Sequence, residues 1–176
     1  MTRRKVRTIC LHGPESVGKS IMAEQLADVL GAELVPEYGR AYCERHGTNL
    51  RMADLLDMAM VQTDLIAEAR ARAERWVVAD TDALMTAVWA DMMLGRRDPW
   101  FQEFRDTADL YLLLNIDLPF VDDGLRIYGG EKDRARFFAL CLVELERRKL
   151  PWTLVSGTGE ARVENALAAI GTILGD

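Results

Sequence analysis

The segment from His12 to Ser20, HGPESVGKS, constrains the fold of this chain more than any other part of its 176 residues. It fits the pattern G-x-x-x-x-G-K-S, which begins at Gly13 and ends with residues 18–20. The glycines of this pattern let the backbone wrap closely around an anion, so that N–H groups and a helix N-terminus point at phosphate oxygens. The lysine neutralises phosphate charge, and the serine hydroxyl can bind Mg²⁺. The segment therefore predicts a nucleotide-phosphate site.

The residues on either side of this loop favour the same interpretation over a chance glycine turn. Residues 6–11 form a β-rich stretch, and residues 21–30 repeat apolar side chains at helical spacing. Strand, loop and helix in this order are the context in which the pattern binds phosphate.

Five apolar β-type runs alternate with helical segments along the chain. They are residues 6–11, 32–35, 76–79, 110–114 and 152–155. Alternation of this kind is typical of a parallel sheet covered on both faces, and 176 residues suit one domain better than two. We therefore expect a single α/β domain over residues 1–176, a three-layer sandwich with a five-stranded parallel sheet. The polar, glycine-punctuated residues 117–133 predict a mobile lid, placed at about 117–150.

Composition excludes several classes of protein. The formal net charge of −6 argues against a nucleic-acid partner, because there is no excess of cations to displace counterions from a phosphate backbone. No run approaches the roughly 20 apolar residues of a membrane span. The basic residues 1–5 lead into a strand and not into a signal-peptide core, so a cytoplasmic protein is expected. Its cysteines and histidines have no metal-ligand spacing. No feature specifies an oligomeric state.

The end of the second strand carries a carboxylate, a phenol and a guanidinium. Pro36 cannot donate a ladder hydrogen bond, so the strand should stop there and release Glu37, Tyr38 and Arg40 into the crevice beyond the sheet. A surface ion pair between Glu37 and Arg40 is the alternative interpretation.

The third strand ends in Asp80-Thr81-Asp82. A carboxylate after an apolar strand is where a phosphate-loop protein supports Mg²⁺, and Asp80 is the candidate. Asp82 either caps the helix that begins near Ala83 or contacts the substrate.

The predicted lid contains Asp122-Asp123-Gly124-Leu125-Arg126, followed by Arg134 and Arg136. Phosphoryl transfer needs positive charge over the migrating group and exclusion of water, which arginines on a closing lid supply. Arg136 is equally compatible with helix-surface pairing to Glu131 or Asp133.

The sequence lacks the features of two classes of nucleotide-binding protein, the GTPase switches and the ring-forming ATPase motors. No N-K-x-D motif follows a strand, and the nearest sequence is Asn115-Ile116-Asp117, so a GTPase switch is not expected. The chain is too short to hold the additional helical subdomain of a ring-forming ATPase motor.

These motifs together resemble the ribosylnicotinamide kinase domain of NadR-type proteins over nearly the whole chain. The resemblance rests on G-P-E-S-V-G-K-S (13–20), E-Y-G-R (37–40), Gln62, D-T-D (80–82), L-P-F-V-D-D-G-L-R (118–126) and Arg134. It implies a P-loop kinase of the nucleoside and nucleotide kinase type with a helical lid. ATP and Mg²⁺ would be the cofactors, and nicotinamide riboside would be converted to nicotinamide mononucleotide for NAD salvage.

The residue roles follow from this resemblance and from the motifs themselves. Catalysis is assigned to Lys19, Glu37, Asp80, Arg126 and Arg134. Nucleotide binding is assigned to Gly13, Glu15, Ser16, Val17, Gly18, Lys19, Ser20, Ile21 and Arg136. Binding of the nucleoside acceptor is assigned to Glu37, Tyr38, Arg40, Gln62, Asp82 and Asp123, and binding of Mg²⁺ to Ser20 and Asp80.

The identity of the acceptor and the identity of the catalytic base each have an alternative. A cationic pyridinium suits a crevice near Glu37, Asp82, Asp122 and Asp123, with Tyr38 or Trp89 stacked on the ring. A different nucleoside or coenzyme precursor, or a non-catalytic nucleotide-binding regulatory module, is the alternative function. Glu37, which Arg40 would help to keep ionised, is the favoured base, and Asp82 is its competitor.

The sequence departs from the family pattern in several places. His12 stands where the family often has glycine, and Ile21 where it has threonine; neither should abolish phosphate binding. No adenylyltransferase or helix-turn-helix segment precedes the loop, so neither a second catalytic step nor a repressor role is expected.

Overall fold

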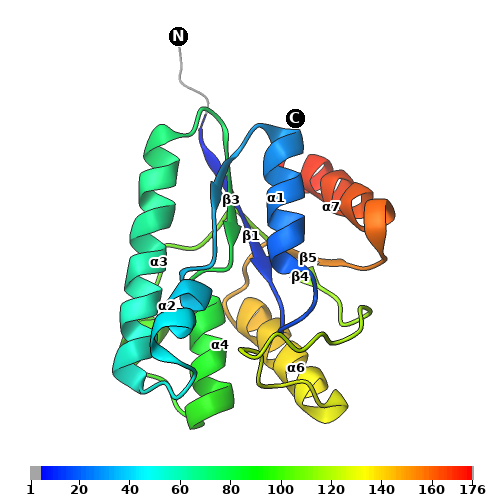
Figure 1. The fold of residues 1–176 in the computed structure, drawn as a ribbon. Coiled ribbons are helices and arrows are strands. Elements are labelled where there is room, and N and C mark those ends of the chain that lie inside the picture. Colours follow the sequence, from blue (N-terminus) through cyan, green and yellow to red (C-terminus); the bar gives the residue numbers. More distant parts are fainter. Residues whose placement is uncertain (1–4, 176) are drawn as a thin grey trace.

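The protein is described by a computed structural model that covers residues 5–175 (Figure 1), and the basic residues 1–4 lie outside it. Its strands are β1 (Arg7–His12), β2 (Glu33–Val35), β3 (Trp76–Asp80), β4 (Leu110–Leu114) and β5 (Trp152–Val155). Its helices are α1 (Lys19–Leu30), α2 (Tyr38–His46), α3 (Met52–Arg72), α4 (Ala83–Leu94), α5 (Pro99–Glu103), α6 (Glu131–Arg147) and α7 (Gly159–Leu174). No helix within residues 5–175 is both long and apolar enough to span a membrane.

The five strands form one parallel sheet in the order β2-β3-β1-β4-β5. This confirms the predicted sheet, with small shifts at the strand ends. β1 begins and ends one residue later than predicted, and β3 includes Asp80 as its last residue. Because all the strands run the same way, their carboxyl ends lie at one edge, where ligands of such sheets bind.

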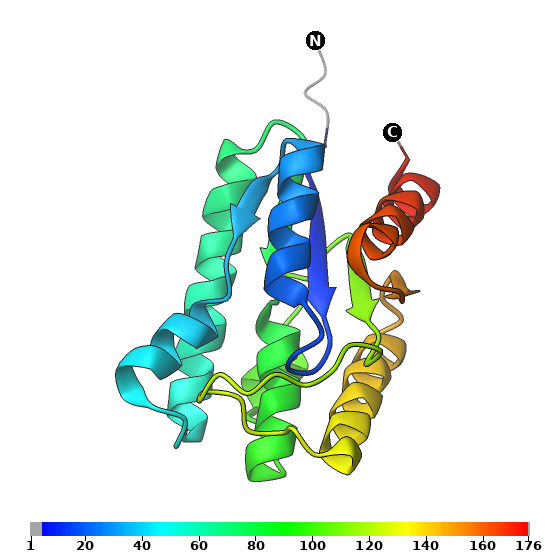
Figure 2. The ribbon, with the colours of Figure 1, turned by 45° about the vertical axis from the view of Figure 1, so that its right-hand side comes forward.

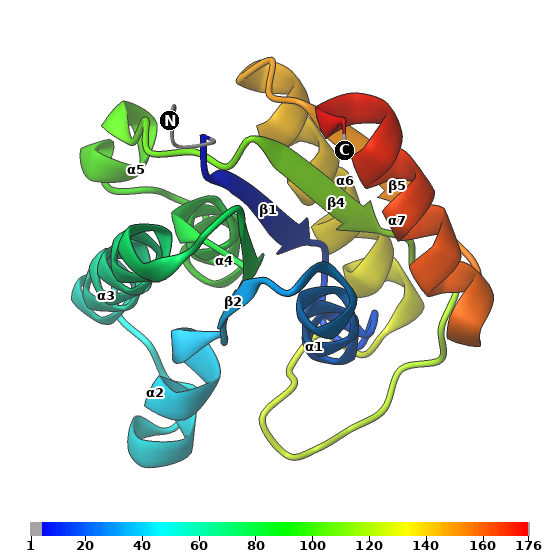
Figure 3. The same cartoon turned by 90° about the horizontal axis from the view of Figure 1, so that it is seen from above.

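Alternate side chains of the central strands enter two separate cores, as the pleat of a strand requires. Ile9 and Leu11 pack with residues of α1 and α7, whereas Cys10 packs with residues of α3 and α4. Figure 3 shows the sheet with helices on both sides. Full burial of one aliphatic side chain contributes about 1.5–3 kcal/mol to the free energy of unfolding. Because side chains are buried on both faces of the sheet, the strand ends are held in place.

The region predicted as a lid, residues 117–150, divides into two parts. Residues 117–130 form no helix or strand, and we call this segment the flap. In Figure 2 the flap runs past the loop between β1 and α1. The second part is α6, whose Phe137, Cys141 and Leu145 are buried in the core beside α4. The helical half of the predicted lid is therefore a covering helix of the sheet, because its apolar face is already buried.

Candidate active site

The loop between β1 and α1, residues 13–18, has a conformation that depends on its glycines. Gly13 has a φ of +139°, and a Cβ added there would lie 3.1 Å from the carbonyl oxygen of Leu114. Gly18, with a φ of +81°, directly precedes the first residue of α1. Side chains rarely tolerate these angles. The helix N-terminus therefore faces the loop as phosphate binding requires.

Lys19 folds back over this loop. Its Nζ donates hydrogen bonds to the carbonyl oxygens of Gly13, at 3.0 Å, and Pro14, at 2.6 Å. A phosphate would offer this ammonium stronger, charge-assisted partners. Of the other predicted nucleotide contacts, Val17 is fully buried in the core and Ile21 is 66% exposed at the start of α1. In this structure Val17 therefore exposes no group to a ligand, and its carbonyl oxygen is bonded to Arg162.

Ser20 and Asp80 come together across the carboxyl edge of the sheet. Ser20 Oγ donates a 2.6 Å hydrogen bond to Asp80 Oδ2. Asp80 Oδ1 is buried and has no partner within the described residues. No group of three or more His, Cys, Asp or Glu in residues 5–175 is arranged to hold a metal ion. A hydroxyl and one carboxylate fit Mg²⁺, which usually keeps several waters and completes its shell with substrate phosphates.

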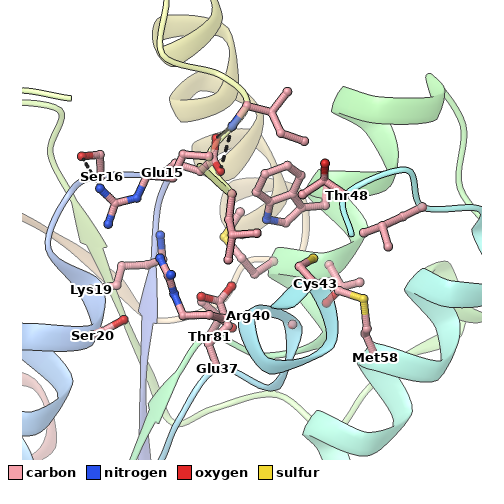
Figure 4. A pocket seen from close by; sticks show the side chains of 18 of the residues that line it. Glu15, Ser16, Lys19, Ser20, Glu37, Arg40, Cys43, Thr48, Met58 and Thr81 are labelled. Carbon is pink, nitrogen blue, oxygen red and sulfur yellow. Dashed lines mark hydrogen bonds between the residues drawn. The ribbon is translucent and has the colours of Figure 1, made fainter. Parts of the chain in front are cut away.

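A pocket of about 170 Å³ adjoins this edge and shares Lys19 and Ser20 with the phosphate loop. Figure 4 shows Lys19, Ser20 and Glu37 on the same side of the pocket, with Arg40 beside them. The far wall is apolar and is formed by Leu50, Leu55, Met58, Met85 and Trp89. The pocket thus has one polar end at the phosphate loop and one apolar end.

Glu37 lies at the tip of β2, immediately before α2, and lines this pocket. Burial, reinforced by the nearby negative charge of Asp80, raises the pKa of Glu37 to about 7. Arg40 acts in the expected direction, since its charge and that of Lys19 lower the pKa of Glu37, but the two offset only part of the increase. A carboxyl with a pKa near 7 is suited to accept a proton at neutral pH.

Arg40 forms an ion pair with the flap. Its guanidinium Nη2 lies 2.6 Å from Asp123 Oδ2. The hydrogen bond from Arg40 is the main reason that the pKa of Asp123 is lowered to about 2. Two predicted acceptor contacts therefore bind each other, and of the two only Arg40 lines the pocket.

Two side chains of the phosphate loop also hold the flap. Glu15 accepts backbone hydrogen bonds from Ile127, at 3.0 Å, and Tyr128, at 2.9 Å. Ser16 Oγ accepts a hydrogen bond from the backbone of Val121 at 2.8 Å. The side chains of Glu15 and Ser16, predicted to bind nucleotide, thus position the flap over the loop.

The three predicted flap arginines differ in their surroundings. Arg126 reaches the phosphate loop, where its Nη1 donates to Ser16 Oγ at 3.1 Å, and it lines the pocket. Arg134 donates to the carbonyl oxygen of Leu118 at 2.8 Å and lies outside the pocket wall. Arg136 is exposed on α6 and forms no ion pair in the described part of the chain. Of these three arginines, Arg126 is the one that the structure of residues 5–175 shows bonded to the phosphate loop.

Asp82 caps helix α4, which is one of the two roles that the sequence left open; the other was contact with the substrate. Its Oδ1 accepts a 2.9 Å hydrogen bond from the backbone of Leu84, and its Oδ2 accepts a 2.5 Å hydrogen bond from the hydroxyl of Tyr111. Burial raises the pKa of Asp82 to about 6, although these hydrogen bonds oppose the shift. Asp82 and Tyr38 are both absent from the pocket wall, so neither contacts this space directly.

Sequence reasoning missed a buried arginine that supports the phosphate loop. Arg162 on α7 is 4% exposed and donates to the carbonyl oxygens of Val17, at 3.2 Å, and Asn115, at 3.0 Å. It also forms an ion pair with Asp117 at the start of the flap. The apolar pocket wall was missed as well, apart from Trp89. Helical spacing alone does not separate a pocket wall from a core.

The sequence of this chain places it in a known family. A family model described as "AAA domain" matches residues 8–162, which include the phosphate loop, Glu37, Asp80 and the flap. The chain belongs to this AAA-domain family.

Known proteins resemble this AAA-domain chain in sequence or in fold. It is 32% identical over 156 residues to the Escherichia coli (strain K12) "Trifunctional NAD biosynthesis/regulator protein NadR", covering 85% of this chain and 38% of that protein. A crystal structure of a NadR protein in complex with NR superposes with a TM-score of 0.86 at 25% identity, covering 99% of this chain and 53% of that one. Thymidylate kinase from Candida albicans matches with a TM-score of 0.69 at 14% identity, over 96% and 92% of the two chains. The fold of this AAA-domain chain is that of the P-loop kinases, and it spans less than half of its curated relative.

Proposed function

We propose that this protein is an ATP-dependent kinase that phosphorylates nicotinamide riboside to nicotinamide mononucleotide, a step of NAD salvage. The observation that carries the proposal is the pocket beside the phosphate loop, which has Lys19, Ser20 and Glu37 in its wall. A protein that only senses a nucleotide needs the phosphate site and has no need of an acceptor pocket facing it. The likeness to NadR, in name a protein of NAD biosynthesis and crystallised with NR, supports the choice of acceptor.

The donor end of the site is suited to ATP with Mg²⁺. Ser20 and Asp80 would hold the metal, which supplies positive charge against the β and γ phosphates. Lys19 would exchange its two carbonyl partners for phosphate oxygens. Arg126, already bonded to Ser16, is the flap arginine placed to add charge over the migrating group.

Glu37 is the proposed base for the acceptor hydroxyl. In the transfer step a ribose hydroxyl of the acceptor forms a bond to the γ-phosphorus and gives its proton to the Glu37 carboxylate. The bond between the γ-phosphorus and its bridging oxygen breaks, and that oxygen leaves with the electron pair as part of ADP. The base contributes moderately, roughly 10²-fold to 10⁴-fold, because the transition state of phosphoryl transfer is loose.

The pocket walls are compatible with a cationic aromatic ring. Trp89 is the aromatic side chain available for stacking, since Tyr38 lies outside the wall. Of the four carboxylates expected near the pyridinium, Glu37 lines the pocket, whereas Asp122 and Asp123 do not. Asp82 is directed into the protein by its two hydrogen bonds. Ring stacking and one nearby carboxylate are the features that would favour a pyridinium over a neutral base.

A screen of acceptors tests the proposal. ADP formation is measured with the purified chain, MgATP and nicotinamide riboside, adenosine, cytidine or uridine. We expect nicotinamide riboside to give the highest kcat/KM. Equal or better rates with an uncharged nucleoside would assign the protein to the general nucleoside kinases. ATP binding without turnover of any acceptor would favour a regulatory module.

A further inference from the structure

Gln62 on α3 connects the ends of two strands that carry the proposed chemistry. Its side chain is almost completely buried, with 3% exposure for the residue. Its Oε1 accepts a 2.8 Å hydrogen bond from the backbone of Tyr38. Its Nε2 donates to the carbonyl oxygens of Pro36 and Thr81, both at 3.3 Å. The amide therefore binds the backbone on both sides of Glu37 and directly after Asp80.

The partners of Gln62 define the orientation of its amide and occupy most of its hydrogen-bond donors and acceptors. A backbone N–H only donates and a carbonyl oxygen only accepts, so the amide oxygen must face Tyr38 and the amide nitrogen must face Pro36 and Thr81. Both N–H groups and one of the two acceptor positions on the oxygen are then engaged. Although Gln62 lies in the pocket wall, little of its amide is left for an acceptor molecule.

The strands need this link because their own pairing stops short of the site. The ladder between β2 and β3 ends with Val35 opposite Ala79. Pro36 then has no N–H with which to continue it. Beyond this point the Gln62 amide takes the place of ladder hydrogen bonds between the two strand ends.

The turn after Asp80 is also one that requires external restraint. Thr81 has a φ of +71°, which is an outlier for a β-branched residue. Such a conformation costs about 1–3 kcal/mol and persists only where the surroundings hold it. Gln62 donates to the carbonyl oxygen of Thr81 on one side of the turn. On the other side, Asp82 is held by the hydrogen bond that it accepts from the backbone of Leu84.

We propose that Gln62 is a positioning residue, which sets the spacing between Glu37 and Asp80, and hence between the acceptor hydroxyl and the metal-bound phosphates, without contacting the acceptor. This inference rests on the proposed kinase function. It differs from the substrate contact expected from the family resemblance, because a positioning residue acts on kcat and a substrate contact acts mainly on KM.

The test replaces Gln62 by methionine, which has a similar length and shape but makes none of the three hydrogen bonds. Thr63→Val is the matched control, because it removes one hydrogen bond from the same helix, to the carbonyl oxygen of Ala59, without touching β2 or β3. Hydrogen exchange of the Tyr38 amide is measured by NMR in the free protein. Steady-state kinetics are measured with MgATP and nicotinamide riboside.

In Gln62→Met we expect the Tyr38 amide to lose its protection while the amides of α3 keep theirs. We expect kcat to fall by roughly 10-fold to 100-fold, because a shift of about 1 Å in catalytic groups has effects of this size, and the KM values to stay within about threefold. Thr63→Val should match the wild type in both measurements. Gln62→Asn, whose amide is one methylene too short to span the three partners, should reproduce the loss and serves if the methionine variant does not fold.

The outcomes separate the inference from the proposed function. A wild type that does not phosphorylate nicotinamide riboside overturns both. An active wild type whose Gln62 variants keep kcat, or raise only the KM of nicotinamide riboside, overturns the positioning role alone. Unchanged protection of the Tyr38 amide in Gln62→Met would also overturn it.

Discussion

Arg40 on α2 and Asp123 in the flap form a 2.6 Å ion pair that joins α2 to the flap beside the pocket. Nothing in the order of the chain suggests this contact, since 83 positions separate the two residues. The pair ties α2 to the flap, so the flap can move away from α2 only if this ion pair breaks.

Asp123→Asn should therefore loosen the flap. A partly exposed ion pair contributes about 0.2–1 kcal/mol, so we expect the acceptor KM to change by at most about fivefold. Hydrogen exchange in residues 119–128 should become faster. Because the pKa of Asp123 is lowered to about 2, the pair is intact throughout pH 5–9 and the effect should not depend on pH in that range. Asp122→Asn, at the exposed neighbouring carboxylate, is the control, and a similar acceleration of exchange in that variant would contradict the prediction.

Lys19→Ala should abolish phosphoryl transfer and leave the fold intact. Lys19 bonds only to carbonyl oxygens of its own loop and has no place in the core, so thermal unfolding should change little. The loss of a charge-assisted contact in the transition state costs several kcal/mol, which corresponds to orders of magnitude in rate. Lys132→Ala, at an exposed lysine of α6, is the control in the ADP-release assay. Near wild-type turnover in Lys19→Ala would remove the basis for the phosphate site.

Glu37→Gln should lower kcat by roughly 10²-fold to 10⁴-fold with little change in ATP binding. The pH profile provides a second measurement. Glu37 accepts a proton only when ionised, and burial raises its pKa to about 7 in the free protein, so the wild-type kcat/KM for the acceptor should fall as the pH drops below about 7. Glu37→Gln should lose this acidic limb, and Glu44→Gln on the same helix should keep it. If the acidic limb of the pH profile stays at the same pH in Glu37→Gln, another group is the base.

Asp80→Asn and Asp82→Asn separate the roles of the remaining carboxylates. Asp80 bonds to Ser20 and has a free buried oxygen, so Asp80→Asn should mainly raise the Mg²⁺ concentration needed for half-maximal rate. Asp82 is occupied by Leu84 and Tyr111, so its variant should mainly lose stability. Single-turnover rates and Mg²⁺ titrations measure both effects. If Asp82→Asn destroys kcat while Glu37→Gln changes only the acceptor KM, the roles of Glu37 and Asp82 are reversed.

Tyr111→Phe should destabilise the protein in a pH-dependent way. Its buried hydroxyl donates to Asp82 and accepts a 3.1 Å hydrogen bond from the backbone of Ala108, so its removal should cost about 1–3 kcal/mol. The pKa of Asp82 is already raised by burial to about 6, and loss of the Tyr111 hydrogen bond raises it further. A raised carboxyl pKa favours the folded state at low pH and disfavours it as the pH rises through that pKa.

The loss in Tyr111→Phe should accordingly be larger at pH 8 than at pH 5. Urea unfolding at the two pH values measures the difference, and Tyr128→Phe, at a partly exposed tyrosine, is the control. Equal losses at both pH values would contradict the assignment of Asp82 as the coupled group.

Local patterns predicted the sheet and the phosphate loop well. The five β-type runs were found within one or two residues, and Gly13, Gly18 and Ser20 occupy the places that their motif indicated. The flap and α6 were less predictable. Residues 117–150 were expected to act as one lid, but Phe137 and Cys141 bury α6 in the core beside α4. A periodic apolar face shows that a helix will pack against something and does not show which surface it covers.

What the sequence determined by itself is the order of strands and helices, the phosphate loop between β1 and α1, and the presence of acids at the ends of β2 and β3. These features depend on residues close together in the chain, whose backbone preferences and periodicity act locally. Only the tertiary structure decided that Arg40 pairs with Asp123, that Asp82 turns to Tyr111, and that Gln62 links the two strand ends. Each of these choices depends on which distant groups the packed core brings within about 3 Å, and on the cost of leaving a buried polar group without a partner.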